Sequence, residues 1–316
     1  MRGGGKPGIM PIQQPSTDNP LLFGRSPSLC YPARPLCIEF RMRKPAVNIA
    51  VQAARKAGTL ITRMLHRADS IAVTEKSQFD FVTEVDKLAE LEIIKEIKKN
   101  YPDHGIWGEE TGRSGNSKYT WCIDPIDGTS NFMRGLPHCS ISIALLEDGI
   151  AQHGVVYDPV RDEMFTASRG GGAYMNERRM RVSSRNGMPG ALIATGFPFR
   201  QRSRLSMQLR MVKALLEDAE DLRRTGSAAL DLAYVACGRL DGYFEFGLQP
   251  WDMAAGALLV RESGGVCVDF EGEEGWFQSG NVIAGNLKVA AALIARIKPL
   301  HGKRKAVVGP ESPTAE

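Results

Sequence analysis

The spacing of apolar residues along the first part of the chain predicts two helices separated by a hairpin. Apolar residues recur at helical spacing over residues 47–65, and a second helix is expected over about 85–99. Residues 70–83 alternate enough for a hairpin with a charged turn near Glu75-Lys76-Ser77. We therefore expect a helix, a hairpin and a second helix before the centre of the chain.

The centre of the chain is rich in predicted strands, and the final third mixes helices with short strands. The central strands are expected over residues 105–108, 119–123, 140–146, 154–157 and 163–167. In the final third we expect helices over about 204–218, 227–237, 252–263 and 286–297, with strands over 191–195, 240–246, 266–269 and 282–284. Because helices and strands interleave without strict βαβ order, the pattern predicts an α/β protein in which helix layers enclose sheets.

The two ends of the chain lack this periodicity. Residues 1–41 contain seven prolines and five glycines, and we expect them to be disordered because they offer too little apolar surface to offset the entropy of ordering. Helical patterning begins after Met42, which we expect to be the native start. Residues 42–300 are then expected to form a single domain, followed by a flexible tail over 301–316.

Composition and charge narrow the class of protein. A hydrophobic content of 43% and a charged content of 24% are ordinary for a globular protein. A net charge of +4 does not indicate a dedicated nucleic-acid binder. The six cysteines form no C-x-x-C pair and no zinc spacing, which favours reduced thiols in a cytoplasmic protein. No apolar stretch approaches the roughly 20 residues of a membrane helix, so we expect no membrane partner.

The most informative segment is Asp124-Pro125-Ile126-Asp127-Gly128-Thr129. An apolar run leads into two acidic residues three positions apart, and Pro125 restricts the turn between them. We expect both carboxylates at the carboxyl end of a strand, where α/β folds bind ligands. The residues from Gly128 onwards are typical of a helix N-terminus, whose free N–H groups favour a phosphate. In isolation, the segment is also compatible with an ordinary surface turn.

Two further acidic features weaken that alternative. Glu109 and Glu110 follow the short strand predicted at 105–108, and Asp252 opens a predicted helix. Taken alone, Asp252 could be an N-cap and the two glutamates could be solvated charges. Together with Asp124 and Asp127, however, these residues can form a cage of oxygen ligands, which suits Mg²⁺ because this ion completes its shell with water and phosphate oxygens.

With these residues in place, the chain resembles the inositol monophosphatase family, and within it the bacterial SuhB-type branch. Residues 121–132 match one signature of the family, and Trp251-Asp252-Met253-Ala254-Ala255-Gly256 through Gly264-Gly265 match the other. Residues 223–233 are particularly similar to the SuhB-type branch. The resemblance extends from about Met42 to about Lys298. It implies an αβαβα sandwich of the sugar-phosphatase type and a homodimer.

The resemblance also implies roles for individual residues, with two or three Mg²⁺ ions per site and inhibition by Li⁺. The expected ligands of the first metal are Glu109, Asp124 and the Ile126 carbonyl. Those of the second metal are Asp124, Asp127 and Asp252. The expected phosphate contacts are Gly128 and Thr129, and the expected substrate contacts are Glu245, Ser227 and Ala228. Lys76 and Asp86 match peripheral positions that influence metal occupancy, although both could simply be solvated charges.

These roles imply hydrolysis of a phosphate monoester by a metal-activated water. The catalytic residues are expected to be Asp124, which ligates both metals, with Glu109 and the Thr129 hydroxyl orienting the water and accepting its proton. A myo-inositol monophosphate or a related polyol phosphate is the expected substrate, because Glu245 favours a polyhydroxyl compound. Fructose 1,6-bisphosphate, histidinol phosphate and a nucleotide 3′-phosphate stay open as alternatives.

A different kind of function is implied by the SuhB-type branch, which is associated with transcription complexes on ribosomal RNA operons. RNA polymerase and Nus-type factors are therefore expected as possible partners, in addition to catalysis or in place of it. Arginines could form the partner surface, although a solvated position or a dimer interface is the commoner role for such residues. They are Arg178, Arg179, Arg181, Arg185, Arg200, Arg202, Arg204, Arg223 and Arg224.

Overall fold

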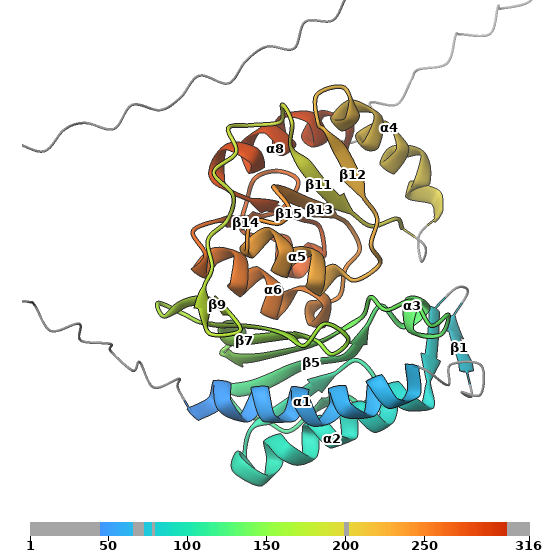
Figure 1. Ribbon diagram of the computed structural model, residues 1–316, viewed down its shortest axis with the longest axis vertical. Helices are drawn as coiled ribbons and strands as arrows, with labels where there is room; N and C mark the ends of the chain where they lie inside the picture. Colours follow the sequence, from blue (N-terminus) through green and yellow to red (C-terminus); the bar gives the residue numbers. More distant parts are fainter. Residues whose placement is uncertain (1–44, 66–72, 78–79, 199–201, 302–316) are drawn as a thin grey trace, which may run out of the picture. The chain divides into compact units, whose positions relative to one another are not determined.

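The computed structural model describes residues 45–65, 73–77, 80–198 and 202–301 (Figure 1). The predictions for residues 1–41 and for the tail after His301 lie outside these ranges. None of the helices in the described ranges is long and apolar enough to cross a membrane.

The described chain forms five alternating layers of helices and sheets (Figure 1). One outer layer, α1 and α2, packs on an eight-stranded sheet, and α5 and α6 fill the space between that sheet and a five-stranded one. The other outer layer, α4 and α8, covers the far face of the five-stranded sheet. The helices of these layers are α1 (Pro45–Leu65), α2 (Glu84–Asn100), α4 (Leu205–Leu216), α5 (Ala228–Ala236), α6 (Pro250–Glu262) and α8 (Leu287–His301). This arrangement confirms the predicted layered α/β fold.

The large sheet is mostly antiparallel, and the one parallel pair in it joins β3 to β5. Its spatial order is β10 (Arg178–Arg179), β9 (Gly172–Met175), β8 (Glu163–Ser168), β7 (Ile150–Asp158), β6 (Ser140–Glu147), β5 (Tyr119–Asp127), β3 (Gly105–Gly108) and β4 (Gly112–Ser114). The small sheet has the order β12 (Asp221–Arg223), β11 (Leu192–Thr195), β13 (Gly242–Glu245), β15 (Val282–Gly285) and β14 (Val266–Val268). The remaining elements are the hairpin β1 (Val73–Ser77) and β2 (Asp80–Thr83), the short helices α3 (Thr129–Phe132) and α7 (Trp276–Ser279), and the 3₁₀ turn η2 (Arg202–Arg204).

The structure corrects several predicted element boundaries. The strand expected to end at residue 123 continues to Asp127, because Asp124 and Asp127 still pair with β6. The strand expected over 154–157 begins at Ile150. In the hairpin, Glu75 and Ser77 pair with β2 and so belong to β1 and not to the turn that was expected near them. The short strands β4, β9, β10 and β12 were not expected, because they have too few residues to show an alternating pattern.

His104 ties the start of β5 to the segment that precedes β3. The fully buried Trp121 donates its indole N–H to Nδ1 of His104 over 3.0 Å. The imidazole also stacks between Tyr101 and Tyr119, with ring centroids 4.6 and 5.0 Å away. Burial, helped by the charge of Lys98, lowers the pKa of His104 from its ordinary value of 6.5. The neutral ring is therefore the form that the fold favours.

This environment predicts that the protein loses stability in mild acid. Because the pKa of His104 is lower in the folded state, the unfolded state binds its proton first, and stability falls as the pH drops below about 6.5. Replacing His104 with Phe should weaken this dependence. It should also cost about 1–3 kcal/mol at pH 7.5, because the Trp121 N–H loses its acceptor. Urea unfolding at pH 7.5 and 5.5 checks both effects, and an unchanged pH dependence in the variant would contradict the assignment to His104.

Candidate active site

A β-bulge in β5 brings Asp124 and Asp127 to the same face of the sheet. In a regular strand, side chains three positions apart point to opposite faces. Here Asp124 pairs with Ser142 and Asp127 with Ser140, so β5 contains one more residue than β6 over this interval. Ser140 and Ser142 are two apart and share a face, and the two aspartates therefore share it as well. Pro125 sits inside the bulge, where its missing N–H is tolerated.

The shared face is the one covered by α5 and α6. Ser142 donates its hydroxyl to the carbonyl of Trp251 at the start of α6, over 2.8 Å. Ser140 lies 3.1 Å from the Ser227 hydroxyl at the start of α5. Both helices therefore begin directly above the bulge. Their N-termini add positive dipole ends to a surface that carries two carboxylates.

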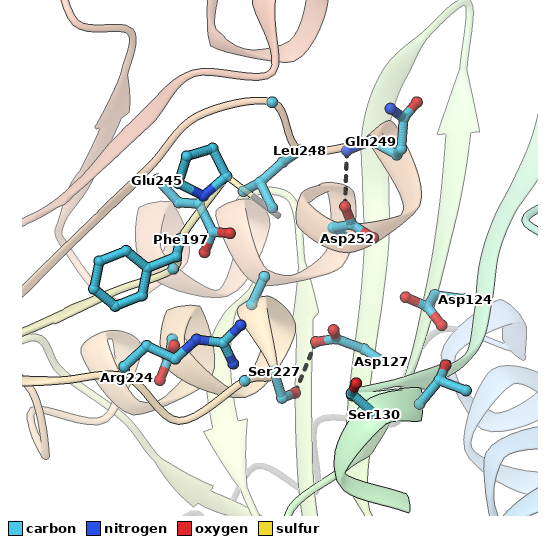
Figure 2. A pocket seen from close by; sticks show the side chains of 18 of the residues that line it. Asp124, Asp127, Ser130, Phe197, Arg224, Ser227, Glu245, Leu248, Gln249 and Asp252 are labelled. Atoms are coloured by element: carbon cyan, nitrogen blue, oxygen red, sulfur yellow. Dashed lines mark hydrogen bonds between the residues drawn. The ribbon is translucent and has the colours of Figure 1, made fainter. Parts of the chain in front are cut away.

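Asp127 is held by the first turn of α5. One carboxylate oxygen, Oδ2, accepts the Ser227 hydroxyl over 2.7 Å (Figure 2) and the Ala229 N–H over the same distance. Burial raises the pKa of Asp127, and these two hydrogen bonds oppose the rise. Ser227, which was expected to contact substrate, is thus also the N-cap of α5 and an anchor for Asp127.

Asp252 is held in a similar way by the first turn of α6. Its Oδ2 accepts the Gln249 N–H over 2.7 Å (Figure 2). Asp252 is the third residue of α6 and forms a capping box with Gln249, so it is not the N-cap itself. Its helix-capping role and a metal-ligand role are therefore compatible, because the capping bond uses one carboxylate oxygen.

Glu109, which directly follows β3, lies beside the aspartates of β5. The parallel pairing of β3 and β5 sets Gly108 opposite Ile123, and the Glu109 N–H donates to the Ile123 carbonyl over 3.1 Å. Continuing the register by one residue sets Glu109 beside Asp124. The topology thus brings the end of β3 next to Asp124.

Most of the site residues predicted from the sequence line one cavity of about 330 Å³. Figure 2 shows Asp124, Asp127 and Asp252 approaching one another, while Glu245, Phe197 and Arg224 lie at the other side of the pocket. The predicted residues that line it are Glu109, Asp124, Ile126, Asp127, Gly128, Thr129, Ser227, Ala228, Glu245 and Asp252. Asp86 lies behind this lining, and the side chain of Lys76 is outside the described part of the chain.

Asp124 is a buried acid whose nearest charged neighbours are also acids. Burial raises its pKa well above the usual range, and the next largest causes are the negative charges of Glu109 and Asp127. Asp252 and Asp86 add to the effect. Such like-charge clustering becomes favourable when a cation is bound between the carboxylates.

The donor set fits a hard divalent cation by its chemistry. All four candidate side chains offer carboxylate oxygens, which Mg²⁺ and Ca²⁺ prefer. Within the described residues, however, no group of three His, Cys, Asp or Glu side chains is gathered closely enough to hold a metal ion as it stands. A bound cation would therefore have to draw the carboxylates together or complete its shell with water and substrate oxygens.

The Thr129 hydroxyl faces two acceptors. It lies 3.0 Å from the Ile126 carbonyl and 3.1 Å from Oδ1 of Asp86, and it has a single proton to donate. Donation to Asp86 would leave the Ile126 carbonyl available as a ligand. Asp86 is buried, and its Oδ2 accepts the backbone N–H and the hydroxyl of Thr83 at the start of α2. Of the two alternatives for Asp86, the buried contact with Thr129 favours a role in the site over a solvated charge.

The side of the cavity opposite the aspartates is formed in part by the small sheet. Glu245 at the end of β13 accepts the hydroxyl of the buried Tyr243 over 2.6 Å, which fixes one of its oxygens. Its carboxyl group packs so closely on Gly196 that a Cβ there would lie 2.0 Å from Oε1. The backbone of Gly196 thus forms the back wall behind Glu245.

Sequence reasoning missed several residues that line the same cavity. Asp231 is buried on α5 and accepts the Thr225 hydroxyl over 2.7 Å. Burial raises its pKa well above the usual range. An acidic residue inside the otherwise apolar sequence of α5 was an available signal. Arg134, Arg202 and Arg224 also line the cavity, so two of the arginines first considered as a partner surface face the pocket. No local pattern singles out these three side chains.

Comparison with known proteins gives consistent matches over most of the chain. The inositol monophosphatase family matches residues 42–301. A relative from Xylella fastidiosa, named Nus factor SuhB, is 54% identical over 258 residues, which are 80% of this chain and 94% of the relative. The crystal structure of the extragenic suppressor protein suhB from Bartonella henselae has a TM-score of 0.79 at 42% identity, covering 81% of this chain and 99% of that one. An inositol monophosphatase from Anabaena (Nostoc) has a TM-score of 0.73 at 35% identity, covering 80% and 95%.

Gly128 should tolerate no side chain, for two separable reasons. Its φ of +99° disfavours L-residues, and a Cβ would lie 3.1 Å from the carbonyl oxygens of Gly226 and His138. Gly112 is a matched control because its φ is +72° and no atom lies within 4 Å of its Cβ position. We expect Gly112→Ala to cost about 1–2 kcal/mol from backbone strain alone, and Gly128→Ala to cost more. Equal losses in urea unfolding would contradict the crowding at Gly128.

Proposed function

Because the chain belongs to the inositol monophosphatase family, we propose that it is a Mg²⁺-dependent phosphatase that hydrolyses phosphate monoesters of myo-inositol or a related polyol. The observation that carries the proposal is the buried carboxylate of Asp124, which lies among other carboxylates at the wall of a cavity. Burying like charges together is costly unless a cation offsets them. The family is generally metal-dependent, and oxygen-only donors favour Mg²⁺.

The proposed roles of the residues follow from their positions. Mg²⁺ would supply acidity to a water molecule and charge for the leaving oxygen. Glu109 and the Thr129 hydroxyl would orient the attacking water, and the Glu109 carboxylate would accept its proton. Donation of the Thr129 hydroxyl to Asp86 would support this role, because it would leave the Thr129 oxygen free to accept from water. Gly128, together with Thr129, is proposed to contact the phosphate.

The proposed preference for a polyhydroxyl substrate rests on Glu245. Its carboxyl group faces the cavity opposite the metal end (Figure 2), and the Tyr243 hydroxyl holds it in place. A hydrogen-bond acceptor on the side of the cavity opposite the acidic cluster suits the hydroxyl groups of a substrate whose phosphate lies near Asp124. Ser227 and Ala228 border the same space. The chain is further proposed to act as a homodimer in the cytoplasm.

A second proposed role is association with transcription factors. It is favoured by the name of the Xylella fastidiosa relative, Nus factor SuhB, which is 54% identical to this chain. Arg178, Arg179, Arg181 and Arg185 are exposed on and after β10, so they are available to a partner or to a second subunit. Arg185 already pairs with Asp241 over 3.5 Å. Arg200 lies outside the described residues.

Replacing Asp124 with Asn should separate activity from stability. We expect phosphatase activity to fall at least ~100-fold, because loss of a ligand should cost no less than loss of an outer-shell partner. Without Mg²⁺, the variant should be as stable as the wild type or more so, because the substitution removes a repelled, buried charge. Activity assays and thermal unfolding in EDTA test the two effects. Asp158→Asn is the control, because Asp158 is a buried acid whose partner is Arg161 and which does not line the cavity. A folded Asp124→Asn protein with near-wild-type activity would refute the site.

Replacing Glu245 with Gln should alter substrate choice more than chemistry. For a polyol phosphate we expect kcat/KM to fall by about 10-fold or more, since a hydroxyl acceptor is lost. For 4-nitrophenyl phosphate, which has no such hydroxyl groups, the change should be small. The assay is a screen of inositol, sugar, histidinol and nucleotide phosphates with Mg²⁺, with and without Li⁺. Equal losses on all substrates would argue against a role for Glu245 in recognition.

The transcription role predicts that partner binding survives loss of catalysis. Asp124→Asn protein should retain RNA polymerase and Nus-type factors in a pull-down to the same extent as wild-type protein. Charge reversal at the exposed Arg178 and Arg179 should reduce retention if this surface takes part. Failure of wild-type protein to retain any of these factors would remove the second role and leave the phosphatase proposal intact.

A further inference from the structure

Glu90 is a fully buried carboxylate on α2 that has no part in the roles discussed above. Its side chain lies under the segment that leaves β3. Oε2 accepts the Glu110 N–H over 2.9 Å, and Oε1 accepts the Thr111 N–H over 2.8 Å. Both oxygens are therefore used to hold the backbone immediately after Glu109. Charge-assisted bonds of this kind are stronger than those between neutral groups.

The backbone passes over Glu90 with no spare room. A Cβ at Gly108 would lie 2.3 Å from Oε1 of Glu90, so any side chain there would displace the Glu90 carboxylate. The next residue, Glu109, donates its N–H to the Ile123 carbonyl of β5. Glu109 is thus anchored to the sheet by its own N–H, and to α2 by the two residues that follow it.

The position of Glu90 along α2 shows that its burial is specific. The buried face of this helix includes Asp86, Glu90, Ile93 and Ile97, which recur at spacings of four, three and four. A carboxylate on such a face is costly unless its oxygens are hydrogen-bonded. The two backbone N–H groups after Glu109 meet that requirement. The same two hydrogen bonds restrain the loop after β3 at a fixed distance from α2.

We propose that Glu90 is a positioning residue for the metal site: it fixes the backbone of residues 109–111 so that the Glu109 carboxylate faces Asp124, and it thereby sets the affinity of the site for a divalent cation. Glu90 does not line the cavity, so it acts through Glu109 and not by contact with metal or substrate. The proposal rests on the proposed metal-dependent function for its effect on affinity. Its structural part, the restraint on residues 110 and 111, stands independently.

Glu90→Gln is the direct test, because the amide keeps the shape but turns one acceptor into a donor that faces a backbone N–H. We expect the Mg²⁺ concentration for half-maximal activity to rise about 10-fold or more, as for other outer-shell partners of metal ligands. The KM for substrate measured at saturating Mg²⁺ should change little. Glu96→Gln is the matched control, because Glu96 is 6% exposed on the same helix and its side chain pairs with Lys56, away from Glu109. Half-saturation within twofold of wild type in Glu90→Gln would overturn the proposal.

Amide hydrogen exchange without Mg²⁺ supplies a readout that does not depend on activity. The Glu110 and Thr111 amides should be protected in wild-type protein and should exchange at least ~10-fold faster in Glu90→Gln, whereas amides of β5 should keep their rates. Unprotected amides at both positions in wild-type protein would overturn the proposal even if no variant folds. If Glu90→Gln does not fold, Glu90→Asp, whose carboxylate is one methylene further back, should show the same two effects.

The two readouts separate this proposal from the proposed function. If wild-type protein has no phosphatase activity, the phosphatase proposal fails, and Mg²⁺ binding by calorimetry replaces the activity assay for Glu90. Weaker Mg²⁺ binding in Glu90→Gln with unchanged binding in Glu96→Gln then supports the positioning role. Equal binding in wild type and Glu90→Gln contradicts it.

Discussion

Repulsion among buried carboxylates is the interaction around which the rest of this structure is arranged. Asp124 is enclosed by the sheet and by α6, and the charges nearest to it are negative. Burying such a carboxylate is costly unless hydrogen bonds hold the neighbouring acids in place. The first turns of α5 and α6 restrain Asp127 and Asp252, and the start of α2 restrains Asp86. Asp127, Asp252 and Asp86 are thus each fixed by backbone or hydroxyl donors. Hydrogen bonds from the first turns of three helices offset the repulsion between these carboxylates.

Many of the residues that line the cavity could be predicted from the sequence because they are residue types grouped at short spacing. Asp127 lies at the end of β5 and Asp252 in the first turn of α6, and the expected layers of helices and sheets are present. The bulge could not be predicted, because it is defined by pairing with Ser140 and Ser142, which follow β5 in the sequence. The sequence alone therefore suggested a turn after residue 123, where the structure continues the strand.

Other features escaped prediction because they depend on distant contacts. The role of Glu90 becomes visible only when α2 is placed under the loop after β3, although an acidic residue on a buried helical face was a local hint. The fixed orientation of Glu245 requires Tyr243 on its own strand and Gly196 on another segment. Short charged strands such as β12 offer no alternation by which they could be identified.

The bulge in β5 also makes the site sensitive to chain length in a way that ordinary strands are not. Insertion of one further residue between Asp124 and Asp127, with the single-residue bulge kept, would turn one carboxylate to the opposite face of the sheet, toward α1 and α2. Insertions in surface loops carry no such penalty. Within this fold, the spacing of the acidic residues in β5 is therefore restricted to a fixed number of residues, whereas the opposite side of the cavity is lined by several separate segments. Divergence in substrate choice is consequently expected to arise from those segments, with the spacing in β5 held constant.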